Sequence, residues 1–252
     1  MTRLPRSAGP SDAAAHLAAW EAAAVVPAVA RPAVLLAHLD DVAEAALDVP
    51  IGVCAAWSAA ELSRVGGTDV DVVLTCAACA AELEITLDVE PWAAVPHTSS
   101  VAEEASVSTV SGEVSVRAPT TRDLLACRDT GNPVAALRAR CLRGADRGEL
   151  TVAQLAHLTS ADLGRIDDAA RELSGPAGAV IRTSCPACDA DVVVPLDLGA
   201  LWWEQTAADA RRLLAEVAVL ARAFGWGEDA VLALSPTRRA TYLALAGEAG
   251  VP

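Results

Sequence analysis

The 252-residue sequence predicts an α+β fold that is mostly helical and contains two short, related β-hairpins. Two observations carry this prediction. Long stretches rich in Ala and Leu repeat their apolar residues at helical spacing. Two other stretches place a CxxC pair between short runs of alternating β-branched residues, which is typical of strands joined by a tight turn.

These patterns divide the chain into five consecutive segments. Gly and Pro residues mark most of the boundaries between the segments. The expected organisation is N-terminal helices at 1–65, a first CxxC hairpin at 66–92, an inserted hairpin with short helices at 93–178, a second CxxC hairpin at 179–198 and a C-terminal helical region at 199–252.

The N-terminal segment is expected to form three helices. Ser11 is placed to cap the first, and Pro27 ends it. The second follows Arg31-Pro32, where leucines share one stripe. The third covers Val53–Arg64 and ends at Gly66-Gly67.

The inserted segment is expected to begin with a polar loop at Val95–Ser106 and to continue as a hairpin that turns at Ser111-Gly112. Pro119 closes this hairpin and TTRDLL begins a helix. Three further short helices are expected; they span Val134–Leu142, Val152–Leu158 and Ala161–Leu173.

The C-terminal region contains the longest predicted helix, Leu198–Phe224. Gly225 interrupts it, and Glu228 with the following Asp favours a new helix start through the helix dipole. Ser235-Pro236 then combines an N-cap with proline at the first position of the last helix.

The composition excludes several classes of protein. Mean hydropathy is positive, but no uncharged run reaches the roughly 20 apolar residues of a membrane span, so no membrane association is expected. The first residues lack the apolar run of a secretory signal. The formal net charge of −14 is the opposite of what general nucleic-acid binding requires. Seven cysteines without a dense disulfide pattern indicate a reducing, cytoplasmic setting.

The two CxxC elements are copies of one repeat and predict a metal site. In both copies a Leu-Asp ends the hairpin and the Asp lies twelve positions after the first cysteine. Each CxxC at a hairpin tip directs two thiolates at one centre, and two such knuckles complete a cage of four sulfurs. The sequence therefore predicts a split zinc-ribbon-like module with one structural Zn²⁺, whose ligands are Cys76, Cys79, Cys185 and Cys188.

Other interpretations of these cysteines stay open. A rubredoxin-like iron site uses the same ligands, and the thiols could also be buried without metal. A thioredoxin-like redox pair would need a helix after the first cysteine, where strands are expected. His97 is an alternative ligand for the first knuckle.

The residue after the second cysteine is commonly Gly, which adopts a left-handed conformation freely. Here it is Ala80 in the first copy and Asp189 in the second. Because Ala adopts this conformation less readily than Asp, the first knuckle is expected to be distorted or to have lost affinity for the metal. The other three cysteines lie in helical patterns with apolar neighbours and are expected in the core; they are Cys54, Cys127 and Cys141.

No pattern of catalytic residues stands out, and a cage closed by four thiolates leaves no position for a catalytic water. The protein is therefore predicted not to be an enzyme. An alternative class is a zinc-ribbon regulator associated with nucleic acid, which would need a basic face. The acidic residues in both knuckle segments, such as Glu84 and Asp191, argue against it.

Several segments together resemble one protein family. The stretch LLAEVAVLARAFGWGEDAVLALSPTRRATYLAL is similar to the C-terminal signature of T-even-type phage baseplate hub assembly chaperones. The paired knuckles, each followed by Leu-Asp, resemble the zinc-knuckle members found with contractile phages, tailocins and contractile injection systems. The elements PTTRDLL at Pro119–Leu125 and Arg-Cys-Leu at Arg140–Leu142 match further parts of the pattern.

The resemblance implies a non-enzymatic role in assembling the baseplate of a contractile tail-like particle, or in the particle itself. The implied partners are baseplate or hub proteins, met in the cytoplasm. Aromatic and Arg residues are common at the centres of interfaces. The candidate partner-binding residues are therefore Trp202, Trp203, Arg222, Trp226, Arg238, Arg239 and Tyr242.

Overall fold

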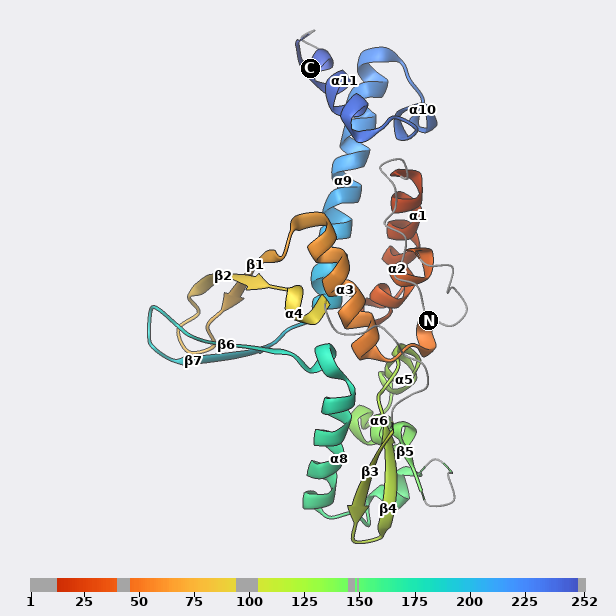
Figure 1. The fold of residues 1–252 in the computed structure, drawn as a ribbon, viewed down its shortest axis with the longest axis vertical. Helices are drawn as coiled ribbons and strands as arrows, with labels where there is room; N and C mark the ends of the chain where they lie inside the picture. The colour runs from red at the N-terminus through yellow and green to blue at the C-terminus, as the bar shows by residue number, and fades with distance from the viewer. Residues whose placement is uncertain (1–12, 40–45, 94–103, 145–147, 149, 249–252) are drawn as a thin grey trace.

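The computed structural model describes residues 13–39, 46–93, 104–144, 148 and 150–248. It confirms the α+β prediction: helices dominate the described residues and the strands form three small antiparallel sheets. Three parts extend from a central group of helices (Figure 1). The CxxC hairpins project to one side, a C-terminal helical tip lies at one end of the molecule, and the inserted α/β unit lies at the other.

The central group is built from helices α1 (Ala13–Ala24), α2 (Arg31–Leu39), α3 (Ile51–Gly66) and the start of α9 (Leu198–Phe224). Small side chains let these helices approach closely. The clearest case is Gly199 in α9, where an added Cβ would lie 2.4 Å from Pro32 Cγ of α2. The buried residues of this core are Ala19, Ala23, Leu35, Ala55, Ala59, Leu62, Val72, Val89, Ile181, Leu196, Leu198 and Trp202.

Helix α9 connects the central group to the tip. Its bounds, Leu198–Phe224, are those predicted from the sequence. Asp197 caps its start by accepting the Ala200 backbone N–H at 2.9 Å. Gly225, with φ 71°, ends the helix in the left-handed conformation. Helices α10 (Glu228–Leu232) and α11 (Pro236–Glu248) then fold back onto it around a second apolar cluster.

The CxxC hairpins have the expected alternation. Strand β1 (Asp69–Thr75) pairs with β2 (Glu82–Asp88), and β6 (Val180–Ser184) pairs with β7 (Asp191–Pro195). In each hairpin one face is exposed and the other is buried, and the buried faces of the two hairpins pack on each other around the cysteines. One backbone bond closes the base of each hairpin: Val89 N–H donates to the Thr68 oxygen at 2.8 Å, and Leu196 N–H donates to the Ala179 oxygen at 2.9 Å.

The inserted unit is a three-stranded sheet covered by helices. Strands β3 (Glu104–Thr109), β4 (Gly112–Arg117) and β5 (Leu142–Arg143) form the sheet. Its helices are α5 (Thr121–Cys127), α6 (Pro133–Cys141), α7 (Val152–Leu155) and α8 (Ser160–Leu173). Capping boxes at Thr120, Thr151 and Thr159 begin three of them.

Several details differ from the sequence predictions. The stretch expected as a loop up to residue 106 already contains the start of β3, and β5 and the short α4 (Glu90–Ala93) were not expected. The predicted cap Ser11 lies outside the described residues, as does most of the expected polar loop. Within the described residues, no helix is both long and apolar enough to span a bilayer.

Candidate metal centre

The four cysteines of the two CxxC pairs converge at the tips of the hairpins. Their sulfur atoms all lie within 4.8 Å of one another. The Sγ atoms of Cys76 and Cys188 are 3.8 Å apart, and those of Cys79 and Cys185 are 3.6 Å apart. Four sulfurs at about 2.3 Å from a tetrahedral zinc would be roughly 3.8 Å apart, so these residues could hold a metal ion.

The two knuckles have the same backbone geometry. In the first, Cys76 N–H donates to the Ala81 oxygen and Ala80 N–H donates to the Cys76 oxygen, both at 2.9 Å. In the second, the matching bonds join Cys185 to Ala190 at 2.9 Å and Asp189 to Cys185 at 2.8 Å.

The residue after the second cysteine is left-handed in both copies, with φ 58° at Ala80 and 57° at Asp189. The expectation that alanine distorts the first knuckle was therefore wrong. The turn keeps its shape, and Ala80 is held in a conformation that L-residues adopt at an energetic cost.

The backbone around the sulfurs favours thiolates, but the sulfurs oppose one another. Backbone N–H groups of Cys79 and Ala78 point at the Cys76 sulfur and lower the pKa of that thiol to about 7. The Ala81 N–H acts in the same direction on Cys79. The adjacent sulfurs of Cys188 and Cys185 outweigh it and raise the pKa of Cys79 to about 12. Four thiols this close cannot all ionise without a cation among them.

Two of the four sulfurs are buried and two face solvent. Cys76 and Cys185 are buried together with Leu83 and Val192, which come from β2 and β7 and form the core between the two hairpins. Cys79 and Cys188 are exposed at the tips. Because this core has only four buried residues, and two of them are cysteines, its stability depends on what the sulfurs bind.

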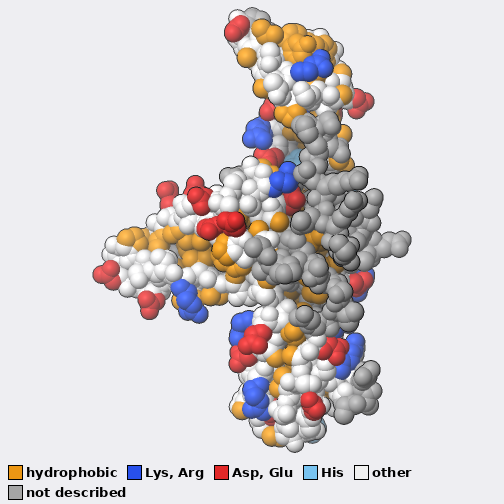
Figure 2. Space-filling view, in the orientation of Figure 1, with side chains coloured by type: hydrophobic (Ala, Val, Ile, Leu, Met, Phe, Trp, Pro, Cys, Tyr) orange, Lys and Arg blue, Asp and Glu red, His pale blue; other side chains and the backbone are white. Residues whose placement is uncertain are grey.

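The outer face of the first hairpin is acidic. Acidic side chains occupy five of the eight exposed positions in its two strands, and Asp69 lies directly opposite Asp88 in the strand register. Figure 2 shows acidic side chains along the projecting hairpins. Such a face repels phosphate groups.

The other three cysteines are buried in helices α3, α5 and α6, as expected. Burial raises the pKa of Cys54 and of Cys141 to about 11 and also raises that of Cys127. These thiols are neutral core residues at neutral pH. The alternative ligand His97 lies outside the described residues.

The adjacent tryptophans at the start of α9 have different surroundings. Trp202 is 6% exposed and packs in the central core, so its side chain is not offered to a partner. Trp203 is half-buried, and the guanidinium of Arg31 lies over its ring, 4.5 Å from the centroid. Of the two, Trp203 is the one that reaches the surface.

The other candidate partner residues gather at the C-terminal tip. Trp226 stacks on Phe224 at 4.9 Å between ring centroids and meets Tyr242 edge-on at 4.8 Å. Arg239 is largely buried, and its Nε donates to Glu216 at 2.6 Å. Arg238 and Arg222 are exposed. Arg239 therefore stabilises the tip, and the exposed basic surface belongs to the other two arginines.

A buried ion network in the inserted unit was not predicted from the sequence. Asp123 in α5 accepts hydrogen bonds from Arg117 at 2.6 and 3.0 Å and from Arg140 Nε at 2.9 Å. It also closes the capping box with Thr120. These bonds hold the pKa of Asp123 well below its ordinary value, although burial alone would raise it.

Comparisons with models of known protein families, with curated proteins and with solved structures find no match to this chain. Within the described residues, the four cysteines are the one group of His, Cys, Asp and Glu side chains whose geometry suits a metal ion.

Proposed function

We propose that Cys76, Cys79, Cys185 and Cys188 bind one structural Zn²⁺. The observation that supports this most directly is the pair of sulfur separations, 3.8 and 3.6 Å, which matches a tetrahedral cage. Zinc supplies positive charge that stabilises four thiolates and has no redox chemistry of its own. The same ligands suit iron, so the metal must be identified by measurement.

The metal would clamp two hairpins that are far apart in sequence. Cys79 and Cys185 are separated by 106 positions, and the whole inserted unit lies between them. Two-stranded hairpins are marginally stable alone. With four protein ligands the ion has no open coordination position, so its role is structural and the protein is proposed to be non-enzymatic.

Metal analysis of the purified full-length protein tests this proposal. We expect one zinc per chain in the wild type and less than about a tenth of that in Cys185→Ser, which removes a buried ligand. Cys127→Ala is the matched control, since it changes a buried cysteine outside the cage and should keep the metal. A wild-type protein without stoichiometric metal would contradict the proposal, and bound iron would correct the identity of the ion.

We further propose that the protein helps to assemble the baseplate of a contractile tail-like particle in the cytoplasm. The resemblance of its sequence segments to baseplate hub assembly chaperones supports this role. The resembling segments also contribute key contacts of the fold: Asp123 and Arg140 pair in the inserted unit, and Glu216 and Arg239 pair at the tip. The proposed partner is a baseplate or hub protein.

Arg238, one of the two exposed arginines named at the tip, provides the test. In cells that produce such particles, the tagged protein should co-purify with baseplate proteins, and Arg238→Glu should reduce this recovery at least about fivefold. Arg182→Glu, an exposed arginine on β6, is the matched control and should leave recovery unchanged. Recovery of wild type without any baseplate protein would contradict the assembly role. Equal recovery of baseplate proteins with Arg238→Glu and with Arg182→Glu would contradict the proposal that the tip is the docking surface.

A further inference from the structure

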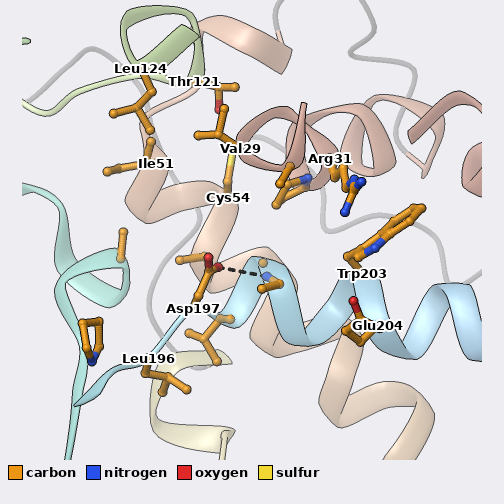
Figure 3. Close-up of a pocket in the computed structure, with 18 residues that line it drawn as sticks. Val29, Arg31, Ile51, Cys54, Thr121, Leu124, Leu196, Asp197, Trp203 and Glu204 are labelled. Atoms are coloured by element: carbon orange, nitrogen blue, oxygen red, sulfur yellow. Dashed lines mark hydrogen bonds between the residues drawn. The ribbon is translucent and has the colours of Figure 1, made fainter. Parts of the chain in front are cut away.

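A cavity of about 460 Å³ lies where the N-terminal helices, the inserted unit and the start of α9 meet. Figure 3 shows its walls: Val29 and Arg31 from the N-terminal part, Cys54 from α3, Leu124 from α5 and Trp203 from α9. Most of the lining is apolar. A volume of this size is within the range of sites that enclose small organic ligands.

Two of the helices that line the cavity pack closely against each other. An added Cβ on Gly199 would lie 2.4 Å from Pro32 Cγ, so helices α2 and α9 touch directly beside the cavity. Cys54 stays a neutral thiol there because burial raises its pKa to about 11. The charged residues of the lining are therefore Arg31, Asp197 and Glu204.

Arg31 has no polar partner for its charge among the described residues. Its Nε atom is buried without a hydrogen-bond acceptor, and its guanidinium lies over the Trp203 ring. It also stands in the first turn of α2, where the helix dipole disfavours a cation. A buried donor without an acceptor is costly, so the site favours an acceptor supplied from outside.

The two carboxylates of the lining do not fill this role. Asp197 accepts the Ala200 N–H and caps α9. Glu204 is exposed on α9 and makes no hydrogen bond or ion pair to Arg31. The cavity thus combines an apolar interior with one stacked arginine, whose planar fork suits a carboxylate.

We infer that this cavity binds a small carboxylic acid with an apolar body, whose carboxylate pairs with Arg31 while its hydrocarbon part fills the space between Val29, Cys54 and Leu196. The binding needs neither the metal nor the baseplate role. It adds to the proposed assembly function a ligand site where the N-terminal helices, the inserted unit and the start of α9 meet.

Titration calorimetry on the full-length, metal-loaded protein tests the inference, with octanoate and hydrocinnamate as probes. Their alcohols, octanol and hydrocinnamyl alcohol, are matched probes without the carboxylate. We expect saturable one-to-one binding of at least one acid and at least about tenfold weaker binding of its alcohol. Arg31→Gln should weaken the acid at least about tenfold and leave the alcohol unchanged, whereas Arg182→Gln should change neither.

A second variant keeps the test decisive if Arg31→Gln does not fold. Ala200→Leu places a larger side chain in the cavity wall on a helix, where leucine is well tolerated, and should weaken acid and alcohol alike. No saturable binding of either acid to wild type at about 10 mM would overturn the inference. Equal affinity for acid and alcohol, or an unchanged acid affinity in Arg31→Gln, would overturn it as well.

Discussion

The carboxylate of Asp123 is held by Arg140 Nε at 2.9 Å, seventeen positions further along the chain. Asp123 is almost completely buried, and Arg117 binds both of its oxygens. One side chain thus joins the end of β4, the start of α5 and the end of α6. The inserted unit is organised around this carboxylate.

Replacing this carboxylate should be costly. Asp123→Asn leaves two arginines beside an uncharged group, and we expect the free energy of unfolding to fall by about 3 kcal/mol. Urea denaturation measures it. Asp48→Asn is the control, because Asp48 pairs with Arg122 at the exposed surface and should cost less than about 1 kcal/mol. Equal losses in the two variants would contradict a structural role for the network.

The stability should depend on pH through the same group. The pKa of Asp123 lies below its ordinary value of 3.8, so its ionised form stabilises the folded state fully above the unfolded pKa. As the pH falls through the folded pKa, this contribution is lost. The stability difference between wild type and Asp123→Asn should be constant above about pH 5 and shrink below about pH 4. A stability difference between wild type and Asp123→Asn that grows on acidification would contradict this prediction.

Removing the metal should unfold the hairpin tips and leave the helices intact. The core between the hairpins is small, whereas the central helices have their own apolar core. After treatment with a chelator, hydrogen exchange should speed up at least about tenfold in 74–83 and 183–192. It should stay unchanged in the centre of α9. Loss of protection throughout the chain would mean that the metal supports the entire fold.

Replacing the left-handed residues of the knuckles by glycine should strengthen metal binding. Ala80→Gly should relieve the strain at φ 58° and strengthen metal binding by about 1 kcal/mol, or roughly fivefold in competition with a chelator. Asp189→Gly should gain less, because aspartate tolerates this conformation better. Ala78→Gly is the control within the same turn and should bring no gain. Weaker binding in Ala80→Gly would contradict the strain argument.

Two helical glycines should respond in opposite ways to alanine. Gly52→Ala drives a Cβ against the Ser174 oxygen and should destabilise the protein by about 2 kcal/mol or more. Gly164 in α8 has no atom near the added Cβ, so Gly164→Ala should stabilise by about 1 kcal/mol through helix propensity. Thermal melts of both variants measure the two signs.

Local patterns predicted most of this molecule. Helical spacing located α9, and the repeat in Cys76 to Asp88 and Cys185 to Asp197 identified the four cysteines that converge. The Asp123 network was missed because it joins charged residues from three elements, and no local period marks such a meeting. Strand β5 has two residues, too few for an alternation to be visible.

The cavity beside Arg31 could not be predicted for a related reason. Its walls come from helices that are distant in sequence. From the sequence alone, an arginine at the start of a helix is expected to be an ordinary surface residue. Only the tertiary arrangement shows that its Nε is buried without an acceptor. Local sequence patterns predict helices and strands, but they do not predict the cavities that form between these elements.

Helix α9 gives the molecule a mechanical property. Its 27 residues span about 40 Å, with one half fixed in the central core and the other carrying the tip. Helix α1 packs along it and reaches α10, which stiffens the connection. The helix therefore sets the distance between the cavity at its base and the aromatic cluster at the tip.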